Sequence, residues 1–390
     1  MISKGPEEGN GGPGDGVSRW VCFDGEGDLS VVLPMSFRTP PSGIRAPEGK
    51  KKILLVRLSS GGDVLQTLPA LAILRRRLPD AHLTFLVEDR FAPFVQGRPE
   101  IDTLRIWPRR QWSPFLPSRR LPGSLAGALA FFAETTKARF DTVLDFQGNL
   151  KSGLHTGFSL APLRVGFDRR SAREGNVLFT NRRVPASETG SRIVKYVALL
   201  AGIGITGERP APVPLPSGAA EAHERAAADQ GRPREGFLAV HPGTSPRGAA
   251  KQWPLERWRT LLSRLGREGP VLLSWGPGEE PAAEALRGIR GVFTPPRPLG
   301  VPALAGALVR ARAFVGPDSA PLHLAHVLGC PAVGLFGPTD PARYAPWMTG
   351  EAVASPLPCA PCHRWRCADP VCMEAIEVDE VAEAIARVTR

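Results

Sequence analysis

Short apolar runs alternate with amphipathic stretches along most of this chain, and no other sequence feature limits its fold as strongly. In a first series, the strand-like runs occupy residues 53–58, 82–87, 104–107, 140–146 and 163–167. Helical stretches lie between them, after Asp63 through Leu78 and at 123–139 and 150–160. Because parallel strands need a crossover between them, this alternation predicts a parallel sheet with helices on both faces.

The alternation stops at residues 206–235 and then restarts. Prolines 210, 212, 214 and 216 and an acidic, Ala-containing stretch suggest a linker that holds one helix. Strand-like runs return at 237–241, 271–275, 313–316 and 332–336, and helical stretches follow them at 255–268, 279–287, 301–310 and 320–328. The sequence thus predicts an α/β fold of two doubly wound, Rossmann-like domains that face a central cleft. Ligands are expected beyond the carboxyl ends of the strands.

The same pattern sets the expected domain boundaries. A Gly/Pro-rich extension covers 1–49, the first domain 50–205, the linker 206–235 and the second domain 236–390. In the extension, only residues 20–23 and 29–33 suggest order, as a hairpin. In the first helix, Pro69 predicts either a distortion or a second helix start with Thr67 as its N-cap.

Positive charge is the main signal in the composition. The chain has 49 Lys and Arg against 38 Asp and Glu, a net charge of +11. This balance suits nucleic acid, an anionic membrane face or an acidic substrate, unless the arginines only cover solvated helices. The two tyrosines and the absence of basic stretches interleaved with aromatic residues argue against nucleic acid as a partner.

No targeting or membrane-spanning segment is evident. The most apolar stretch, 121–133, is shorter than the roughly 18 residues of a span, and the N-terminal residues lack the apolar region of a signal peptide. A cytoplasmic protein is therefore expected, with any membrane contact peripheral.

The first candidate segment for chemistry is Arg57-Leu58-Ser59-Ser60-Gly61-Gly62-Asp63, directly after an apolar strand. Paired glycines let the backbone approach a ligand, and the amides at a helix start favour negative charge. From spacing alone, Asp63 is either a helix N-cap or a general base at the mouth of the cleft.

Two further segments follow strands of the second series. His241-Pro242-Gly243-Thr244-Ser245 precedes Lys251, and hydroxyls beside an ammonium suit a diphosphate unless Lys251 is merely solvated. In the other segment, Asp318 and Ser319 lie at a strand-to-helix junction with Pro321 early in the helix, so the free amides offer a second anion site. His323 and His326 lie on the same predicted helix. Each is either a structural residue or a catalyst.

Six phrases together resemble glycosyltransferase family 9, the lipopolysaccharide heptosyltransferases. They are ILLVRLSSGGDVLQTLPAL (53–71), VLDFQGNLKSG (143–153), RVGFDRRSARE (164–174), HPGTS with KQWP (241–254), SWGPGEE (274–280) and GPDSAPLHLAHVLGCPAVGLFGPTDP (316–341). The resemblance implies a GT-B fold with an N-terminal acceptor domain and a C-terminal donor domain. It also implies inverting transfer from ADP-L-glycero-β-D-manno-heptose without a required metal or other cofactor.

The resemblance also assigns roles to residues of the cleft. Asp63 resembles the general base, and Lys251 the cation that neutralises the departing diphosphate. Glu279 or Glu280 resembles a nucleoside-binding acid, and Asp318 a group that holds heptose hydroxyls. The remaining donor-binding candidates are Thr244, Ser245, Ser319, Ala320 and His323. Two departures from the family pattern are the long turn 246–250 and Ala320, which stands where the family often has Gly.

The positively charged residues of the first domain are candidates for binding the acceptor. Basic residues in the first-domain motifs would suit Kdo carboxylates or phosphorylated inner-core sugars, unless some are structural, as Arg173 would be if paired to Glu174. The acceptor-binding candidates are Arg57, Ser60, Gly62, Lys151, Arg169, Arg170 and Arg173. The phrase GFDRRSARE favours an enzyme that adds the first heptose, whereas a Cys-rich tail is seen more in those that add the second. The alternative from another class is a catalytically silent GT-B protein that binds nucleotide-sugar or lipopolysaccharide precursor. A second alternative is a family member that transfers a different sugar.

Four cysteines gather near the C-terminus. Cys359, Cys362, Cys367 and Cys372 could hold a structural zinc ion, remain reduced thiols or form disulfides. Their spacing is not that of a standard zinc finger, so reduced thiols are the expectation. Cys22 and Cys330 are expected to be isolated thiols.

Overall fold

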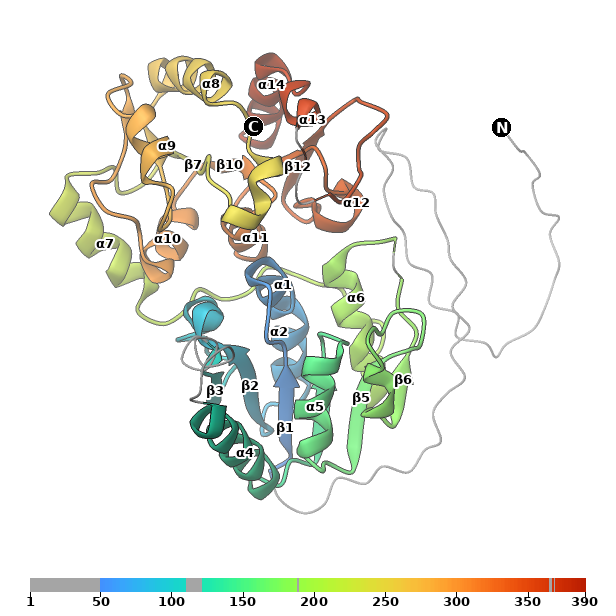
Figure 1. Cartoon of the computed structure of the whole chain (residues 1–390). Helices are drawn as coiled ribbons and strands as arrows, with labels where there is room; N and C mark the ends of the chain where they lie inside the picture. Colours follow the sequence, from blue (N-terminus) through green and yellow to red (C-terminus); the bar gives the residue numbers. More distant parts are fainter. Residues whose placement is uncertain (1–49, 110–120, 188, 365–366, 368) are drawn as a thin grey trace, which may run out of the picture. The chain divides into compact units, whose positions relative to one another are not determined.

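The computed structural model describes residues 50–390 apart from 110–120, 188, 365–366 and 368. The expected hairpin at 20–23 and 29–33 lies outside these residues. All described residues belong to one compact unit of the chain. Two six-stranded sheets, each with helices packed on it, account for most of the unit (Figure 1).

The first sheet has strand order β3-β2-β1-β4-β5-β6, and every neighbouring pair is parallel. Its strands are β1 (Lys52–Val56), β2 (His82–Glu88), β3 (Thr103–Trp107), β4 (Thr142–Asp145), β5 (Leu163–Phe167) and β6 (Arg182–Val184). The central strand β1 pairs Val56 with Leu86 on one side and with Asp145 on the other. The chain reverses its direction of winding between β1 and β4, which is where doubly wound sheets bind ligands.

The second sheet repeats this order as β9-β8-β7-β10-β11-β12, again all parallel. Its strands are β7 (Leu238–Val240), β8 (Val271–Leu273), β9 (Val292–Phe293), β10 (Ala313–Pro317), β11 (Ala332–Phe336) and β12 (Gly350–Ala354). The predicted α/β class with two Rossmann-like sheets is confirmed. The sequence did not predict β6, β9 and β12, which lie at sheet edges.

Helices connect the strands in both halves. They are α1 (Gly61–Gln66), α2 (Leu68–Arg77), α4 (Leu121–Lys137), α5 (Leu150–Phe158), α6 (Arg192–Leu199), α7 (Ala219–Gln230), α8 (Leu255–Glu268), α9 (Glu280–Ala285), α10 (Val301–Leu308), α11 (Ala320–Val327), α12 (Pro341–Tyr344), α13 (Val371–Glu374) and α14 (Val378–Val388). None of the described helices is long and apolar enough to cross a membrane. The stretch predicted as a linker contains α7, which packs on α10 where Gly306 leaves no room for a side chain.

The helix after β1 is interrupted where Pro69 predicted a break. α1 ends at Gln66, α2 begins at Leu68, and Pro69 lies in the first turn of α2, where a missing N–H does no harm. Thr67 is the residue between them. Its backbone is helical and its hydroxyl donates to the Val64 carbonyl at 2.6 Å, so it does not cap α2 with its side chain. The predicted second helix start with Thr67 as its N-cap residue is therefore confirmed, although the Thr67 side chain makes no capping hydrogen bond.

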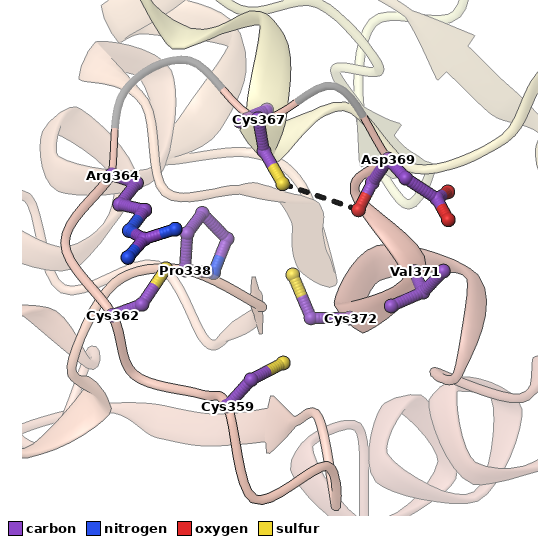
Figure 2. Close-up of a pocket in the computed structure, with 9 residues that line it drawn as sticks. Pro338, Cys359, Cys362, Arg364, Cys367, Asp369, Val371 and Cys372 are labelled. Carbon is purple, nitrogen blue, oxygen red and sulfur yellow. Dashed lines mark hydrogen bonds between the residues drawn. The ribbon is translucent and has the colours of Figure 1, made fainter.

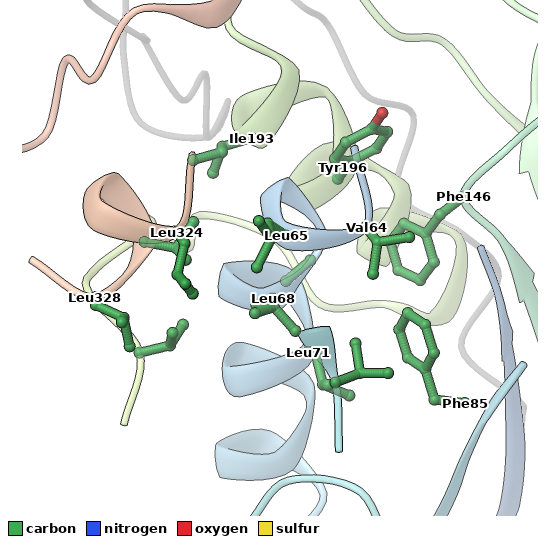
Figure 3. Close-up of a cluster of buried hydrophobic side chains, with 14 of the residues drawn as sticks. Val64, Leu65, Leu68, Leu71, Phe85, Phe146, Ile193, Tyr196, Leu324 and Leu328 are labelled. Atoms are coloured by element: carbon green, nitrogen blue, oxygen red, sulfur yellow. The ribbon is translucent and has the colours of Figure 1, made fainter. Parts of the chain in front are cut away.

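A buried apolar cluster joins the two halves of the molecule. Leu65 and Leu68 of the first half and Leu324 of α11 are 0–1% exposed and belong to the same cluster (Figure 3). Burying one such leucine contributes about 1.5–3 kcal/mol relative to leaving it in water. This packing fixes α1 against α11, and both helices begin just beyond the carboxyl end of a central strand.

Candidate active site

Asp63 lies in the first turn of α1 and is held by three donors. The Arg57 guanidinium contacts its Oδ2 at 2.7 Å, and the Ser60 hydroxyl donates to the same oxygen at 2.9 Å. The Tyr196 hydroxyl donates to Oδ1 at 2.9 Å. A quarter of the carboxylate side chain is still exposed, so a substrate hydroxyl can reach it. The N-cap of α1 is Ser60, not Asp63, which leaves the Asp63 carboxylate available for chemistry.

The charge of Asp63 is set by its neighbours. Burial alone would raise the pKa of this carboxyl, but Arg57, Arg192 and the two hydroxyl donors outweigh burial and hold the pKa below its ordinary value. Asp63 is therefore ionised at neutral pH and can accept a proton. Arg57 also donates to the Phe146 carbonyl at 2.7 Å, so this arginine chiefly positions Asp63.

A pocket of about 170 Å³ opens beside Asp63. Its lining is rich in positive charge: the cations are Arg57, Arg173, Arg192 and Lys195, and the carboxylates are Asp63 and Glu174. Sequence reasoning missed three lining residues of α6, which are Arg192, Lys195 and Tyr196. Their spacing of three and four residues places them on one helix face, and that periodicity of polar residues was the signal available.

The predicted acceptor residues are distributed around this pocket unequally. Arg57 and Arg173 line it, whereas Arg169 and Arg170 are exposed and lie outside its lining. Among the described residues, no ion pair joins Arg173 to Glu174, and the Glu174 carboxylate accepts the Leu150 N–H at 3.2 Å.

Lys151 is engaged away from the pocket lining. It pairs with the fully buried carboxylate of Glu88, which Arg109 also contacts at 3.1 Å. A buried carboxylate needs such partners because an unpaired charge is costly to bury. The Lys151 ammonium also lies 3.5 Å from the Ser59 hydroxyl, one residue from Ser60.

On the second half, Lys251 and Asp318 form a buried pair. Lys251 ends a short 3-10 helix, Pro246–Lys251, and its ammonium lies 3.2 Å from Asp318 Oδ2 and also contacts the Asp318 carbonyl. His323 Nε2 lies 2.9 Å from Asp318 Oδ1. Burial would raise the pKa of Asp318, but Lys251 and His323 more than compensate and lower it, so the carboxylate stays charged.

The two groups of residues meet through α1 and α11. A Cβ on Gly62 would lie 2.5 Å from His323 Cδ2, so only glycine allows this approach. Gln66 Nε2 lies 2.8 Å from His323 Nδ1, and this contact holds a second edge of the imidazole ring against α1. Gly62, an acceptor candidate from the sequence, thus contacts a donor candidate. Gly62 precedes Asp63 in the chain, and His323 contacts Asp318. One residue, His323, therefore lies between Gly62 and the Asp318–Lys251 pair.

The other donor candidates surround the ends of β7 and β8. Glu279 Oε2 lies 3.2 Å from His241 Nε2 and accepts the Gly276 N–H at 2.7 Å. Burial would raise the pKa of Glu279, but His241 and this amide hold it lower. Glu280 begins α9 and is exposed, so of the two alternatives Glu279 is the one that the fold draws into the site.

The hydroxyls of this side differ in their availability. Thr244 donates its proton to the Gly248 carbonyl at 3.0 Å within the long turn, and Ser245 is exposed. The Ser319 hydroxyl is buried at the N-terminus of α11 and has no hydrogen-bond partner among the described residues. Ala320 is the first residue of α11, and its backbone is helical without glycine.

The four C-terminal cysteines lie elsewhere. Cys359, Cys362, Cys367 and Cys372 are free thiols that line one pocket, and Cys330 is a separate, buried thiol. Among the described residues, no group of three or more His, Cys, Asp or Glu side chains is arranged for a metal ion. Cys22 lies outside the described residues.

Two facing Rossmann-like sheets, with an ionised aspartate on one side of their contact and a Lys–Asp pair on the other, form the GT-B architecture that the sequence predicted for a glycosyltransferase. The chain matches the model of glycosyltransferase family 9 (heptosyltransferase) over residues 129–371, more than half of its length. It therefore belongs to that family, as the sequence phrases predicted.

Curated relatives agree with this membership. The chain is similar to lipopolysaccharide heptosyltransferase 1 of Pseudomonas aeruginosa, with 31% identity over 81% of this chain and 87% of that protein. It is also similar to lipopolysaccharide heptosyltransferase 1 of Escherichia coli K12, with 29% identity over 74% of this chain and 89% of that protein.

Solved structures share the fold. The E. coli heptosyltransferase WaaC with ADP superposes with a TM-score of 0.69 at 24% identity, covering 86% of this chain and 99% of that one. The E. coli ADP-heptose heptosyltransferase II gives a TM-score of 0.65 at 17% identity, covering 87% and 98%.

Proposed function

We propose that this glycosyltransferase moves heptose from ADP-L-glycero-β-D-manno-heptose to the Kdo/heptose inner core of lipopolysaccharide, with inversion at the anomeric carbon. The contact of Gly62 with His323 carries the proposal, because it brings the ionised Asp63 and the Asp318–Lys251 pair to one place. Relatives named lipopolysaccharide heptosyltransferase support the sugar, and a related structure with ADP-2-deoxy-2-fluoro heptose supports the donor.

Asp63 is the proposed general base. The acceptor hydroxyl gives its proton to the Asp63 carboxylate while its oxygen bonds to the anomeric carbon of the donor. The bond from that carbon to the β-phosphate oxygen breaks, and ADP leaves. Arg57 and Tyr196 hold the carboxylate in one orientation and leave lone pairs for the substrate, since an ionised carboxylate accepts about four hydrogen bonds.

The donor is proposed to bind between β7, β10 and the start of α11. Lys251 would neutralise charge on the leaving diphosphate, and the amides of α11 with the unpartnered Ser319 hydroxyl would bind a phosphate oxygen. Thr244 and Ser245 would add contacts from the turn. Glu279 would accept a ribose hydroxyl, and Asp318, with His323 behind it, would hold heptose hydroxyls. This scheme requires no metal or other cofactor.

The acceptor is proposed to enter the pocket beside Asp63. Arg173, Arg192 and Lys195 give its lining an excess of positive charge, which suits the carboxylates of Kdo. Ser60, whose hydroxyl donates to Asp63, would contact the acceptor directly. Relatives named heptosyltransferase 1 match at higher identity than those named heptosyltransferase 3, which favours transfer of the first heptose.

The proposed division of labour follows the two sheets. Residues 50–205 would form the acceptor domain and residues 236–390 the donor domain, joined through 206–235. A glycolipid acceptor places the enzyme on the cytoplasmic face of the inner membrane as a peripheral protein, and the surplus of basic residues would favour that anionic surface.

The decisive experiment offers ADP-heptose and competing nucleotide-sugars against lipid A–Kdo and heptosylated acceptors, with mass spectrometry as the readout. We expect one heptose to be added to lipid A–Kdo from ADP-heptose. Transfer of another sugar would contradict the donor, and transfer only to a heptosylated acceptor would contradict the first-heptose assignment. No transfer from any donor by a folded, ADP-binding protein would identify a catalytically silent family member.

Asp63→Asn tests the base. The amide keeps the shape of the carboxylate but cannot take the proton, so turnover should fall by about 10²–10⁴-fold while ADP affinity is retained. Calorimetry with ADP and a thermal melt are the controls, because Arg57 loses its charged partner in this variant. Unchanged turnover would remove Asp63 as the base.

A further inference from the structure

The four cysteines of the C-terminal segment share one pocket that the glycosyl-transfer chemistry does not use. This thiol pocket has a volume of about 320 Å³ and is lined by Cys359, Cys362, Cys367 and Cys372 together with Ala250, Pro338, Arg364, Asp369 and Val371 (Figure 2). It lies beyond the carboxyl end of β11, where Gly337 and Pro338 follow the strand.

The sulfur atoms converge on the cavity. Figure 2 shows the sulfurs of Cys359, Cys367 and Cys372 pointing toward its middle, with Cys362 at its edge beside Pro338. Cys372 is anchored, because it is 7% exposed within α13 and its sulfur would lie 2.9 Å from a Cβ on Gly337. The other three thiols are exposed and lie on loop segments.

The spacing fits a thiolate metal site. Cys359 and Cys362 are separated by two residues, and Cys367 and Cys372 by four, and both separations fall within the two to four residues between paired ligands in structural zinc sites. All four thiols line the same cavity, so a divalent cation bound among them would offset the negative charge of their thiolates.

The cysteine side chains must move a short distance to bind a metal ion. In the described residues the four sulfurs are not yet at ligand distance, and the Cys367 thiol instead donates to the Asp369 carbonyl at 3.2 Å. Because three of the four cysteines lie on exposed loops, they can turn inward onto the fixed Cys372. Zinc would hold the four sulfurs at about 2.3 Å in a closed tetrahedron, with no open position for catalysis.

We propose that Cys359, Cys362, Cys367 and Cys372 bind one divalent cation of the zinc class through four thiolates. Binding releases the four thiol protons and leaves a site of net charge 2−, which the neighbouring Arg364 partly offsets. The ion fastens this segment to the end of β11. Ala250 lines the same pocket directly before Lys251, so the ion also supports the turn that presents Lys251 to Asp318.

The test uses the full-length chain, untagged and purified with a reductant but without chelator. Metal is measured by inductively coupled plasma mass spectrometry, and the apoprotein is titrated with Co²⁺, whose visible spectrum distinguishes tetrahedral thiolate coordination from other ligands. Cys359→Ser and Cys362→Ser change exposed ligands. Cys330→Ser is the matched control, since Cys330 is a buried thiol outside this pocket.

We expect about one zinc ion per chain in the wild type and in Cys330→Ser, and a cobalt spectrum of four thiolates. Cys359→Ser and Cys362→Ser should lose at least ten-fold in zinc affinity while their circular dichroism is unchanged. Less than a tenth of an equivalent of zinc after anaerobic reconstitution, equal zinc affinity in the Cys359 variant, or a disulfide within this set would each overturn the proposal. A haem absorption band would also overturn it, because Cys359-Ala360-Pro361-Cys362-His363 has the spacing at which haem is attached.

Discussion

Replacing Gly62 with Ala tests whether the contact between α1 and α11 sets the geometry of sugar transfer. Gly62 does not have a left-handed backbone, so Ala is compatible with its conformation and would favour the helix by about 1 kcal/mol. The new methyl carbon would lie 2.5 Å from His323 Cδ2, about 1 Å closer than an ordinary van der Waals contact. His323 cannot turn aside at low cost, because Gln66 and Asp318 hold both of its ring nitrogens.

The effect on catalysis should exceed the effect on stability. Overpacking of this kind costs about 1–3 kcal/mol, and the gain in helix propensity offsets part of it. Relief of the clash must shift α1 relative to α11 by an amount approaching 1 Å, and this shift separates Asp63 from the Asp318–Lys251 pair. A misplacement of about 1 Å lowers a rate by roughly 100-fold. We therefore expect kcat to fall about 100-fold while the melting temperature changes by a few degrees.

The assay is steady-state release of ADP with lipid A–Kdo as the acceptor. Gly61→Ala is the matched control: its Cβ would lie 2.9 Å from Phe94 Cε2, the far end of a side chain in the first half that can move away. A Gly62→Ala enzyme as active as the wild type, or one impaired no more than Gly61→Ala, would refute the argument that this contact aligns the two halves.

Two other predictions concern the donor site and the response to acid. Lys251→Ala should weaken ADP binding by about 10–100-fold, which corresponds to the loss of one charge-assisted contact. Lys137→Ala, a change at an exposed lysine, should leave ADP affinity unchanged. Equal ADP affinities of the wild type and Lys251→Ala by calorimetry would exclude Lys251 from diphosphate binding. Burial lowers the pKa of His155 and His326 to about 3, against 6.5 for the unfolded side chain, so unfolding takes up protons below pH 6.5. As the pH falls from 6.5 to 3, the free energy of unfolding in urea should then decrease by up to about 1.4 kcal/mol per histidine for each pH unit. The His155→Phe variant should show a smaller slope. A free energy of unfolding that does not change between pH 7 and 5 would contradict this account.

Most of the fold could be predicted from apolar patterning, because buried parallel strands are apolar on both faces and leave a clear signal. The exceptions have a common cause. β6, with Arg182 and Arg183, and β12, whose residues are mostly not buried, lie at sheet edges, where one side lacks a neighbour and apolar residues are not required. The short β9 was missed because two residues are too few to show a period.

The candidate site could be predicted in part. The segments around Asp63, Lys251 and Asp318 were found because each follows a strand with turn-forming and charged residues, and because their order resembles a known family. Arg192 and Tyr196 were missed, since α6 follows no predicted strand and its charged residues look like an ordinary solvated face. Their proximity to Asp63 depends on how α6 packs across the end of the first sheet.

The two parallel sheets, the family and the residues that carry charge could be predicted from the amino-acid sequence alone, because hydrophobic periodicity and turn chemistry depend on neighbouring positions. Which of these charges meet depends on how the helices and strands pack in three dimensions. Arg57 and Lys151 were equal candidates in the sequence, yet one holds Asp63 and the other neutralises buried Glu88. The approach of Gly62 to His323 joins positions 261 residues apart, and such contacts are fixed by the packing of whole helices, which no local pattern encodes.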